Sequence, residues 1–161
     1  MTKRRQILAG MGIGAIWAIL LGWLPGQGPQ PFIPLNLALV YAFGPGGLVL
    51  LLVIGRLAGR RFFDDEIIDG EAFRPGSAAD IDQRVLTNTS EQMLLAVLLW
   101  PFVAMQLGSV TVIALGISLG VARVLFWVGY HLSPPMRAVG FAATFYPTVF
   151  ATIVSLWRLL T

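Results

Sequence analysis

The chain has no cysteine and only one histidine, His131, among its 161 residues. The absence of cysteine excludes disulfides, thiolate metal ligands and a cysteine nucleophile. A single histidine argues against a histidine-built metal site and against a Ser-His-Asp triad. We therefore expect no metal site in this protein.

Charge is also scarce, because 12% of the residues are charged and 57% are hydrophobic. So little charge cannot cover the surface of a soluble domain of this size, and the mean hydropathy is +0.78. The composition therefore indicates an integral membrane protein with the lipid bilayer as its surroundings. No run interleaves basic and aromatic residues in the manner of a nucleic-acid groove, so we expect no nucleic-acid partner.

Five apolar segments are long enough to cross about 30 Å of hydrocarbon. They occupy residues 7–24, 35–55, 88–107, 109–131 and 137–160. The predicted fold class is therefore all-α integral membrane with five spans. The first segment follows a basic stretch, as a signal peptide does. However, it is longer than a usual signal core and no A-x-A site follows it, so we interpret it as an uncleaved anchor.

Lysine and arginine are concentrated on one side of the predicted topology. The N-terminus, the connection 56–83 and the turn 131–137 carry nearly all of them, whereas 25–34 and 107–110 carry none. The positive-inside rule then places the N-terminus in the cytoplasm and the C-terminus outside. Seven of the eight acidic residues also fall within 56–83, where we expect a solvated acidic loop.

A polar stripe begins the third span. Arg84, Asn88 and Glu91 are spaced i, i+4, i+7 and so share one helical face. Glu91 facing lipid would cost about 2.5–3.5 kcal/mol, so it must face protein or a hydrated cleft. Two interpretations remain open here: a functional site, or a structural ion pair of Glu91 with Arg84 or Arg123.

A second polar set lies at the junction of the last two spans. Arg123 and Tyr130 share a face of the fourth span, with Phe126 between them. Ser133 is a suitable N-cap for the fifth span, and proline is tolerated in a first helical turn. Arg137 then lies in that first turn, where free N–H groups and the helix dipole favour an anion.

Both polar sets lie on the predicted cytoplasmic side. Arginine binds carboxylates through paired hydrogen bonds, and Glu91 could hold an ammonium group. Arg137 at a helix N-terminus could stabilise a thiolate, whose ordinary pKa is about 8.5. Glutathione combines two carboxylates, one amine and one thiol, so this inventory suits it.

Three motifs in order resemble those of the MAPEG superfamily, the membrane-associated proteins in eicosanoid and glutathione metabolism. They are R-x-x-x-N-x-x-E at 84–91, R-x-x-F-x-x-G-Y at 123–130 and P-x-R at 135–137. The resemblance covers roughly residues 35–160. It implies a four-helix domain over 35–161 that assembles as a homotrimer. Residues 1–34 would then form an added N-terminal anchor helix and an uncharged loop.

The resemblance also implies a glutathione site between subunits near the cytoplasmic face. The positions that match glutathione-binding residues are Arg84, Asn88, Glu91, Arg123 and Tyr130. Arg137 matches the arginine that activates the thiol. The implied activity is a glutathione transferase or peroxidase that acts on lipophilic electrophiles. Gln92 lies where eicosanoid-forming members often carry Tyr, and Phe126 lies where relatives can carry Tyr or His. These differences disfavour an eicosanoid-specific role.

Two other functions remain open from the sequence. The polar stripe could be a helix-packing network in a non-enzymatic membrane scaffold. A small transporter is disfavoured, because the polar groups lie toward one side rather than at the midplane. The compact chain, without a sorting motif, leads us to expect a bacterial inner membrane, with the glutathione site on its cytoplasmic side.

Overall fold

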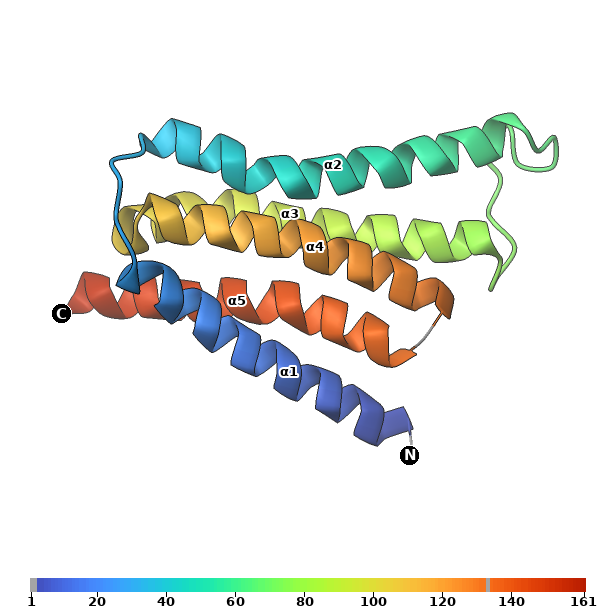
Figure 1. Ribbon diagram of the computed structural model, residues 1–161. Coiled ribbons are helices and arrows are strands. Elements are labelled where there is room, and N and C mark those ends of the chain that lie inside the picture. Colours follow the sequence, from blue (N-terminus) through green and yellow to red (C-terminus); the bar gives the residue numbers. More distant parts are fainter. Residues whose placement is uncertain (1–2, 133) are drawn as a thin grey trace.

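The computed structural model describes residues 3–132 and 134–161. Its long helices pack in a single bundle, and consecutive helices run in opposite directions (Figure 1). They are α1 Lys3–Trp23, α2 Leu35–Phe62, α3 Ala78–Leu107, α4 Ser109–Leu132 and α5 Pro134–Leu160, and the 3-10 helix Leu24–Gln27 follows α1. All five are long and apolar enough to cross a membrane, which confirms the predicted all-α architecture with five candidate spans.

Two helices, α2 and α3, continue well beyond the apolar segments that predicted them. Helix α2 continues to Phe62 and α3 already begins at Ala78, so the non-helical connection is 63–77 rather than 56–83. The Ser77 side chain caps α3 by accepting a hydrogen bond from the Asp80 N–H over 3.1 Å. Hydropathy reports the length of the apolar stretch, whereas a capped helix can continue beyond it.

Small residues allow the helices to approach closely. A Cβ added at Gly116 of α4 would overlap the backbone of Ala42 in α2, and one at Gly14 of α1 would overlap Ala142 in α5. Helix α1 packs mainly on α5, and Figure 1 shows it crossing α5 obliquely. The bundle therefore places α4 beside both α2 and α5, with α1 on the outer side of α5.

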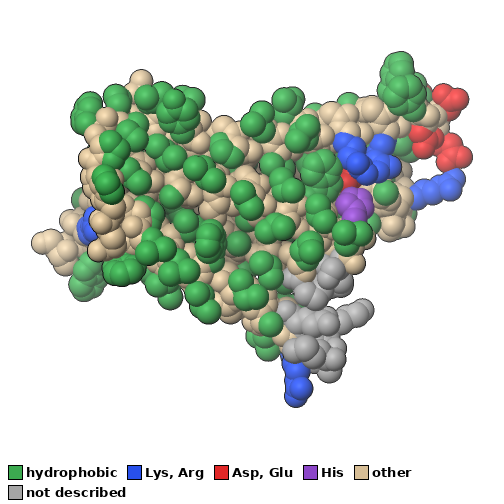
Figure 2. Space-filling model, in the orientation of Figure 1, with side chains coloured by type: hydrophobic (Ala, Val, Ile, Leu, Met, Phe, Trp, Pro, Cys, Tyr) green, Lys and Arg blue, Asp and Glu red, His purple; other side chains and the backbone are tan. Residues whose placement is uncertain are grey.

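The two ends of the bundle differ in polarity. The start of α1, the connection 63–77, the end of α4 and the start of α5 all lie toward one end of the bundle, and the C-terminus lies at the other end (Figure 1). Figure 2 shows hydrophobic side chains over most of the visible face and a gathering of Asp, Glu, Arg and His at the end with the connection 63–77. The predicted polar residues of the last three spans are thus near one end.

Candidate functional site

A pocket of about 370 Å³ opens near the polar end of the bundle, between α1, α3, α4 and α5. Its lining residues are Ile7, Met11, Asn88, Phe126, Tyr130, Arg137, Ala138, Phe141 and Tyr146. Three of the six predicted site residues, namely Asn88, Tyr130 and Arg137, therefore meet around one cavity. The volume lies within the range of about 300–1,000 Å³ that small-molecule sites occupy.

Arg137 reaches this pocket because α4 and α5 touch at two glycines. A Cβ added at Gly129 would overlap the backbone of Arg137, and a Cβ added at Gly140 would lie 2.5 Å from the backbone nitrogen of Phe126. Helix α5 begins at Pro134, so Arg137 lies in its first turn as predicted, while the predicted cap Ser133 is outside the described residues. The close approach of the backbones brings Arg137 next to the end of α4.

The Arg137 guanidinium lies over an aromatic side chain. Its Cζ is 4.8 Å from the centroid of the Tyr130 ring, within the range of a cation–π contact. Tyr130 in turn packs edge-on against Phe126, with ring centroids 5.1 Å apart. Arg137 forms no ion pair with any carboxylate in the described parts of the chain. The positive charge of Arg137 is therefore available to bind an anion in the pocket.

Arg123 lies behind the pocket rather than in its lining, and it is fully buried. Its Nη1 donates to Asn88 Oδ1 over 2.8 Å, and its Nη2 donates to the Gly140 carbonyl over 3.0 Å and to the Thr144 hydroxyl. These bonds tie α3, α4 and α5 together around one guanidinium. Arg123 therefore positions the Asn88 side chain that lines the pocket.

Asn88 connects the buried arginine to the exposed face of α3. While its Oδ1 accepts from Arg123, its Nδ2 donates to Glu91 Oε2 over 3.1 Å. Glu91 is exposed in the single chain and is not part of the pocket lining. Arg84 is also exposed, and its Nη2 pairs with Asp80 Oδ2 at 2.8 Å. Neither Glu91 nor Arg84 lines the pocket within one chain.

The structural ion pair of Glu91 with Arg84 or Arg123, which the sequence left open, is not found in the described parts of the chain. Asp80, one turn before Arg84 on α3, takes Arg84 as its i, i+4 partner. Within the polar stripe, the Asn88 amide therefore contacts Glu91, whereas Arg84 pairs with Asp80.

A second polar cluster surrounds Asp82, which the sequence analysis assigned to a solvated loop. That assignment is wrong for Asp82, because the residue is fully buried in α3. Its Oδ2 lies 2.8 Å from Arg56 Nε and 3.2 Å from Arg60 Nε. Its Oδ1 lies 2.8 Å from Trp127 Nε1 and 2.7 Å from His131 Nε2. One carboxylate therefore joins α2, α3 and α4.

A signal for this cluster was present in the sequence. Arg56 and Arg60 are spaced i, i+4 in α2, and Trp127 and His131 have the same spacing in α4. Each pair therefore places two hydrogen-bond donors on one helix face, and these donors need an acceptor. What the sequence did not supply was the position of Asp82 inside a helix, because α3 had been expected to begin later.

The sequence analysis did not identify three further residues of the pocket, one in α5 and two in α1. Tyr146 lines the pocket from α5, and Ile7 and Met11 line it from α1. Nothing in their sequence context marks them, because aromatic and aliphatic residues are common throughout the spans. Only the packing of α1 against α5 brings them to the pocket.

A bundle of five candidate spans with an arginine-bearing pocket near one end defines a polytopic membrane protein with a small-molecule-sized site. The chain matches the MAPEG family over residues 37–157, most of its length, and it belongs to that family of glutathione-related membrane enzymes. The match begins inside α2 and leaves α1 outside. Comparison with curated proteins and with solved structures gave no match.

Proposed function

We propose that this protein is a glutathione transferase or peroxidase that acts on lipophilic electrophiles. The observation that carries the proposal is the position of Arg137, 4.8 Å over the Tyr130 ring and lining a pocket that also contains Asn88. Family membership supports it, because many MAPEG members are glutathione transferases or peroxidases. The pocket residues also fit glutathione, because the side chains of Arg137, Asn88 and Tyr130 can bind carboxylate, peptide and thiolate groups.

Each pocket residue has a distinct role in this proposal. Arg137 lies in the first turn of α5, where its charge and the positive end of the helix dipole both stabilise a thiolate. Asn88 and Tyr130 offer hydrogen bonds to the peptide groups, and Arg123 fixes the orientation of the Asn88 amide. Bound glutathione supplies a thiolate that forms a C–S bond with an electrophilic carbon as the bond to the leaving group breaks. With a hydroperoxide, the thiolate instead attacks the terminal oxygen, the O–O bond breaks, and the alkoxide takes a proton to become the alcohol. The glutathione sulfenic acid that forms then reacts with a second glutathione to give the disulfide and water. The apolar walls from α1, α4 and α5 exclude water from the reacting groups.

The exposed ends of the polar stripe support a homotrimer with glutathione bound between subunits. Glu91 lies on a helix of candidate membrane-spanning length but is exposed in the single chain. Leaving it against lipid would cost about 2.5–3.5 kcal/mol, so a neighbouring subunit or a polar ligand must cover it. In this arrangement, Arg84 and Glu91 bind glutathione at the subunit boundary. We also propose that the site lies on the cytoplasmic side of a bacterial inner membrane, because the positive-inside rule associates the arginine- and lysine-bearing ends of the helices with the cytoplasm.

A thermal-shift titration with glutathione in detergent tests the proposal. A ligand that binds only the folded state raises the apparent stability by RT ln(1 + [L]/Kd). We expect a dose-dependent rise for the wild type, and a much smaller rise for Arg137→Ala at the same trimer content. Arg74→Ala is the matched control, because Arg74 pairs with Glu66 in the exposed connection and should leave the rise unchanged. A wild type without any rise would contradict the proposal.

One observation favours the alternative function, a non-enzymatic membrane scaffold. The Arg123 guanidinium and Asn88 connect three helices, as a packing network would. Glu91→Gln separates the two functions, because the substitution removes charge and retains shape. An enzyme should keep its trimer and lose glutathione affinity, whereas a scaffold should lose trimer stability whether or not glutathione is present.

A further inference from the structure

Helix α1, which the family match leaves outside, lies directly against α5 through a stripe of small residues. Gly10, Gly14 and Ala18 are spaced i, i+4, i+8 and are all buried. A Cβ added at Gly10 would lie 3.0 Å from the Cβ of Ala138, and one at Gly14 would overlap Ala142. Small residues at this spacing let two helix backbones approach closely. The neighbouring side chains of α1 therefore have fixed positions relative to α5.

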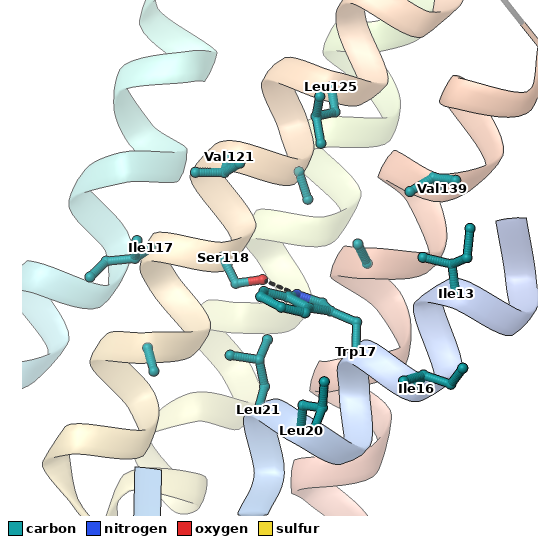
Figure 3. A pocket seen from close by; sticks show the side chains of 13 residues that line it. Ile13, Ile16, Trp17, Leu20, Leu21, Ile117, Ser118, Val121, Leu125 and Val139 are labelled. Carbon is teal, nitrogen blue, oxygen red and sulfur yellow. Dashed lines mark hydrogen bonds between the residues drawn. The ribbon is translucent and has the colours of Figure 1, made fainter. Parts of the chain in front are cut away.

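One flank of this contact holds α1 to α4 as well. Ile13, Trp17 and Leu20 line an apolar cavity of about 720 Å³ between α1, α4 and α5 (Figure 3). Within it, Trp17 Nε1 donates to Ser118 Oγ of α4 over 2.7 Å. A hydrogen bond in such apolar surroundings is costly to break. It therefore fixes the rotation of α1 about its own axis.

The other flank of α1 forms a wall of the pocket that contains Arg137. Ile7 and Met11 are spaced i, i+4, so they share a helix face, and both line this pocket. The polar side chains of the pocket come from α3, α4 and α5, whereas α1 adds only apolar ones. The pocket therefore combines a polar part, which suits glutathione, with an apolar wall on the added helix.

We propose that Met11 and Ile7 of α1 contact the substrate that reacts with glutathione, which we call the acceptor, and limit the size of its apolar group. The inference rests on the proposed function. The reacting atom of the acceptor must meet the thiolate beside Arg137, so the group attached to that atom lies in the same pocket of about 370 Å³. The flexible Met11 thioether adapts to apolar groups of different shape, whereas β-branched Ile7 is stiff. The helix added to the family domain thus carries residues that distinguish one acceptor from another.

The position of Met11 makes this role accessible to mutation. Met11 and Ile7 are 41% and 38% exposed in the chain, so neither is a core residue. Met11→Ala should therefore enlarge the pocket at little cost in stability. Leu8→Ala is the matched control, because Leu8 is 58% exposed on the same helix and lines neither cavity.

Photolabelling tests the contact without requiring turnover. The probe is glutathione with an azidobenzyl group on its sulfur, which places a photoreactive ring where the acceptor lies. We expect adducts at Ile7 or Met11, located by mass spectrometry and prevented by excess S-benzylglutathione. Competed adducts confined to α3, α4 and α5 would overturn the role of α1 and leave the proposed function intact. The absence of any competed adduct would overturn both.

Turnover tests the limit on size. Benzyl chloride and naphthylmethyl chloride react in the same way, by C–S bond formation with loss of chloride, and differ in the size of the ring. We expect Met11→Ala to raise the ratio of kcat/KM for the larger over the smaller chloride by about tenfold. Met11→Leu, which conserves volume, and Leu8→Ala should keep the wild-type ratio.

Glutathione binding separates this inference from the function beneath it. The thermal shift with glutathione should be the same in Met11→Ala as in the wild type, because α1 contributes no polar group to the pocket. A wild-type ratio of the two chlorides in Met11→Ala, at an unchanged thermal shift, would overturn the size limit while keeping the enzyme.

Discussion

The Nη1 of Arg123 in α4, a fully buried residue, donates to Oδ1 of Asn88 in α3 over 2.8 Å. This contact fixes the orientation of the Asn88 amide relative to the pocket. Because the guanidinium also binds the Gly140 carbonyl of α5, one side chain sets both the packing of three helices and the geometry of the site. Stability and ligand binding should therefore change together when Arg123 is altered.

Replacement of Arg123 by leucine is expected to lower the free energy of unfolding by roughly 2–4 kcal/mol. Asn88 Oδ1 and the Gly140 carbonyl would each lose a donor, and an unsatisfied buried acceptor costs about 1–3 kcal/mol. Equilibrium unfolding in mixed detergent micelles measures the change. Arg74→Leu, in the exposed connection, is the control and should change little. Equal stability of the two variants would show that the Arg123 contacts are not the stabilising ones.

Asp82→Asn should also destabilise the bundle, by about 2–3 kcal/mol. The neutral amide leaves Arg56, Arg60 and their helix without a counter-charge. Loss of one partner from a fully buried pair costs about 3–5 kcal/mol, and the smaller value reflects the 49% exposure of the Arg56 side chain. The same unfolding measurement on Asp69→Asn, an exposed position in the connection, gives the comparison. An effect no larger than that of Asp69→Asn would contradict a structural role for Asp82.

Arg137→Ala should change the pH dependence of conjugation more than the amount of folded protein. If the proposed function holds, we expect the bound thiol to ionise below its ordinary pKa of about 8.5 when the cation is present, and the wild-type rate to be already high at neutral pH. Without the cation the thiolate fraction, and with it the rate, should keep rising as the pH passes through that value. The measurement is kcat against pH with a small soluble electrophile. A parallel pH profile in the variant would remove Arg137 from thiol activation.

Gly129→Ala should separate α4 from α5 and displace Arg137. The added Cβ overlaps the Arg137 backbone, and overpacking of this kind costs about 1–3 kcal/mol. We expect a lower melting temperature and at least tenfold weaker glutathione binding by calorimetry. Gly55→Ala in α2 meets no atom within 4 Å, so it should be neutral or slightly stabilising. If Gly129→Ala bound glutathione like the wild type, the close helix contact would be unnecessary for the site.

The sequence by itself determined the spans and predicted candidate residues for the site. Hydrocarbon thickness sets a minimum length for an apolar helix, so five such segments could be counted, and each agrees with one helix. The i, i+4, i+7 spacing marked Arg84, Asn88 and Glu91, and the start of α5 marked Arg137, because helix periodicity and helix ends are local properties.

Only the tertiary structure decided which of those residues share a cavity. It placed Asn88, Tyr130 and Arg137 in the pocket and Arg123 behind it, because the glycine contacts set how closely α4 and α5 approach. It also buried Asp82 among donors from two other helices, and it opened an apolar cavity between α1, α4 and α5. These features depend on how separate helices cross and pack, and neither periodicity nor hydropathy within one helix contains that information.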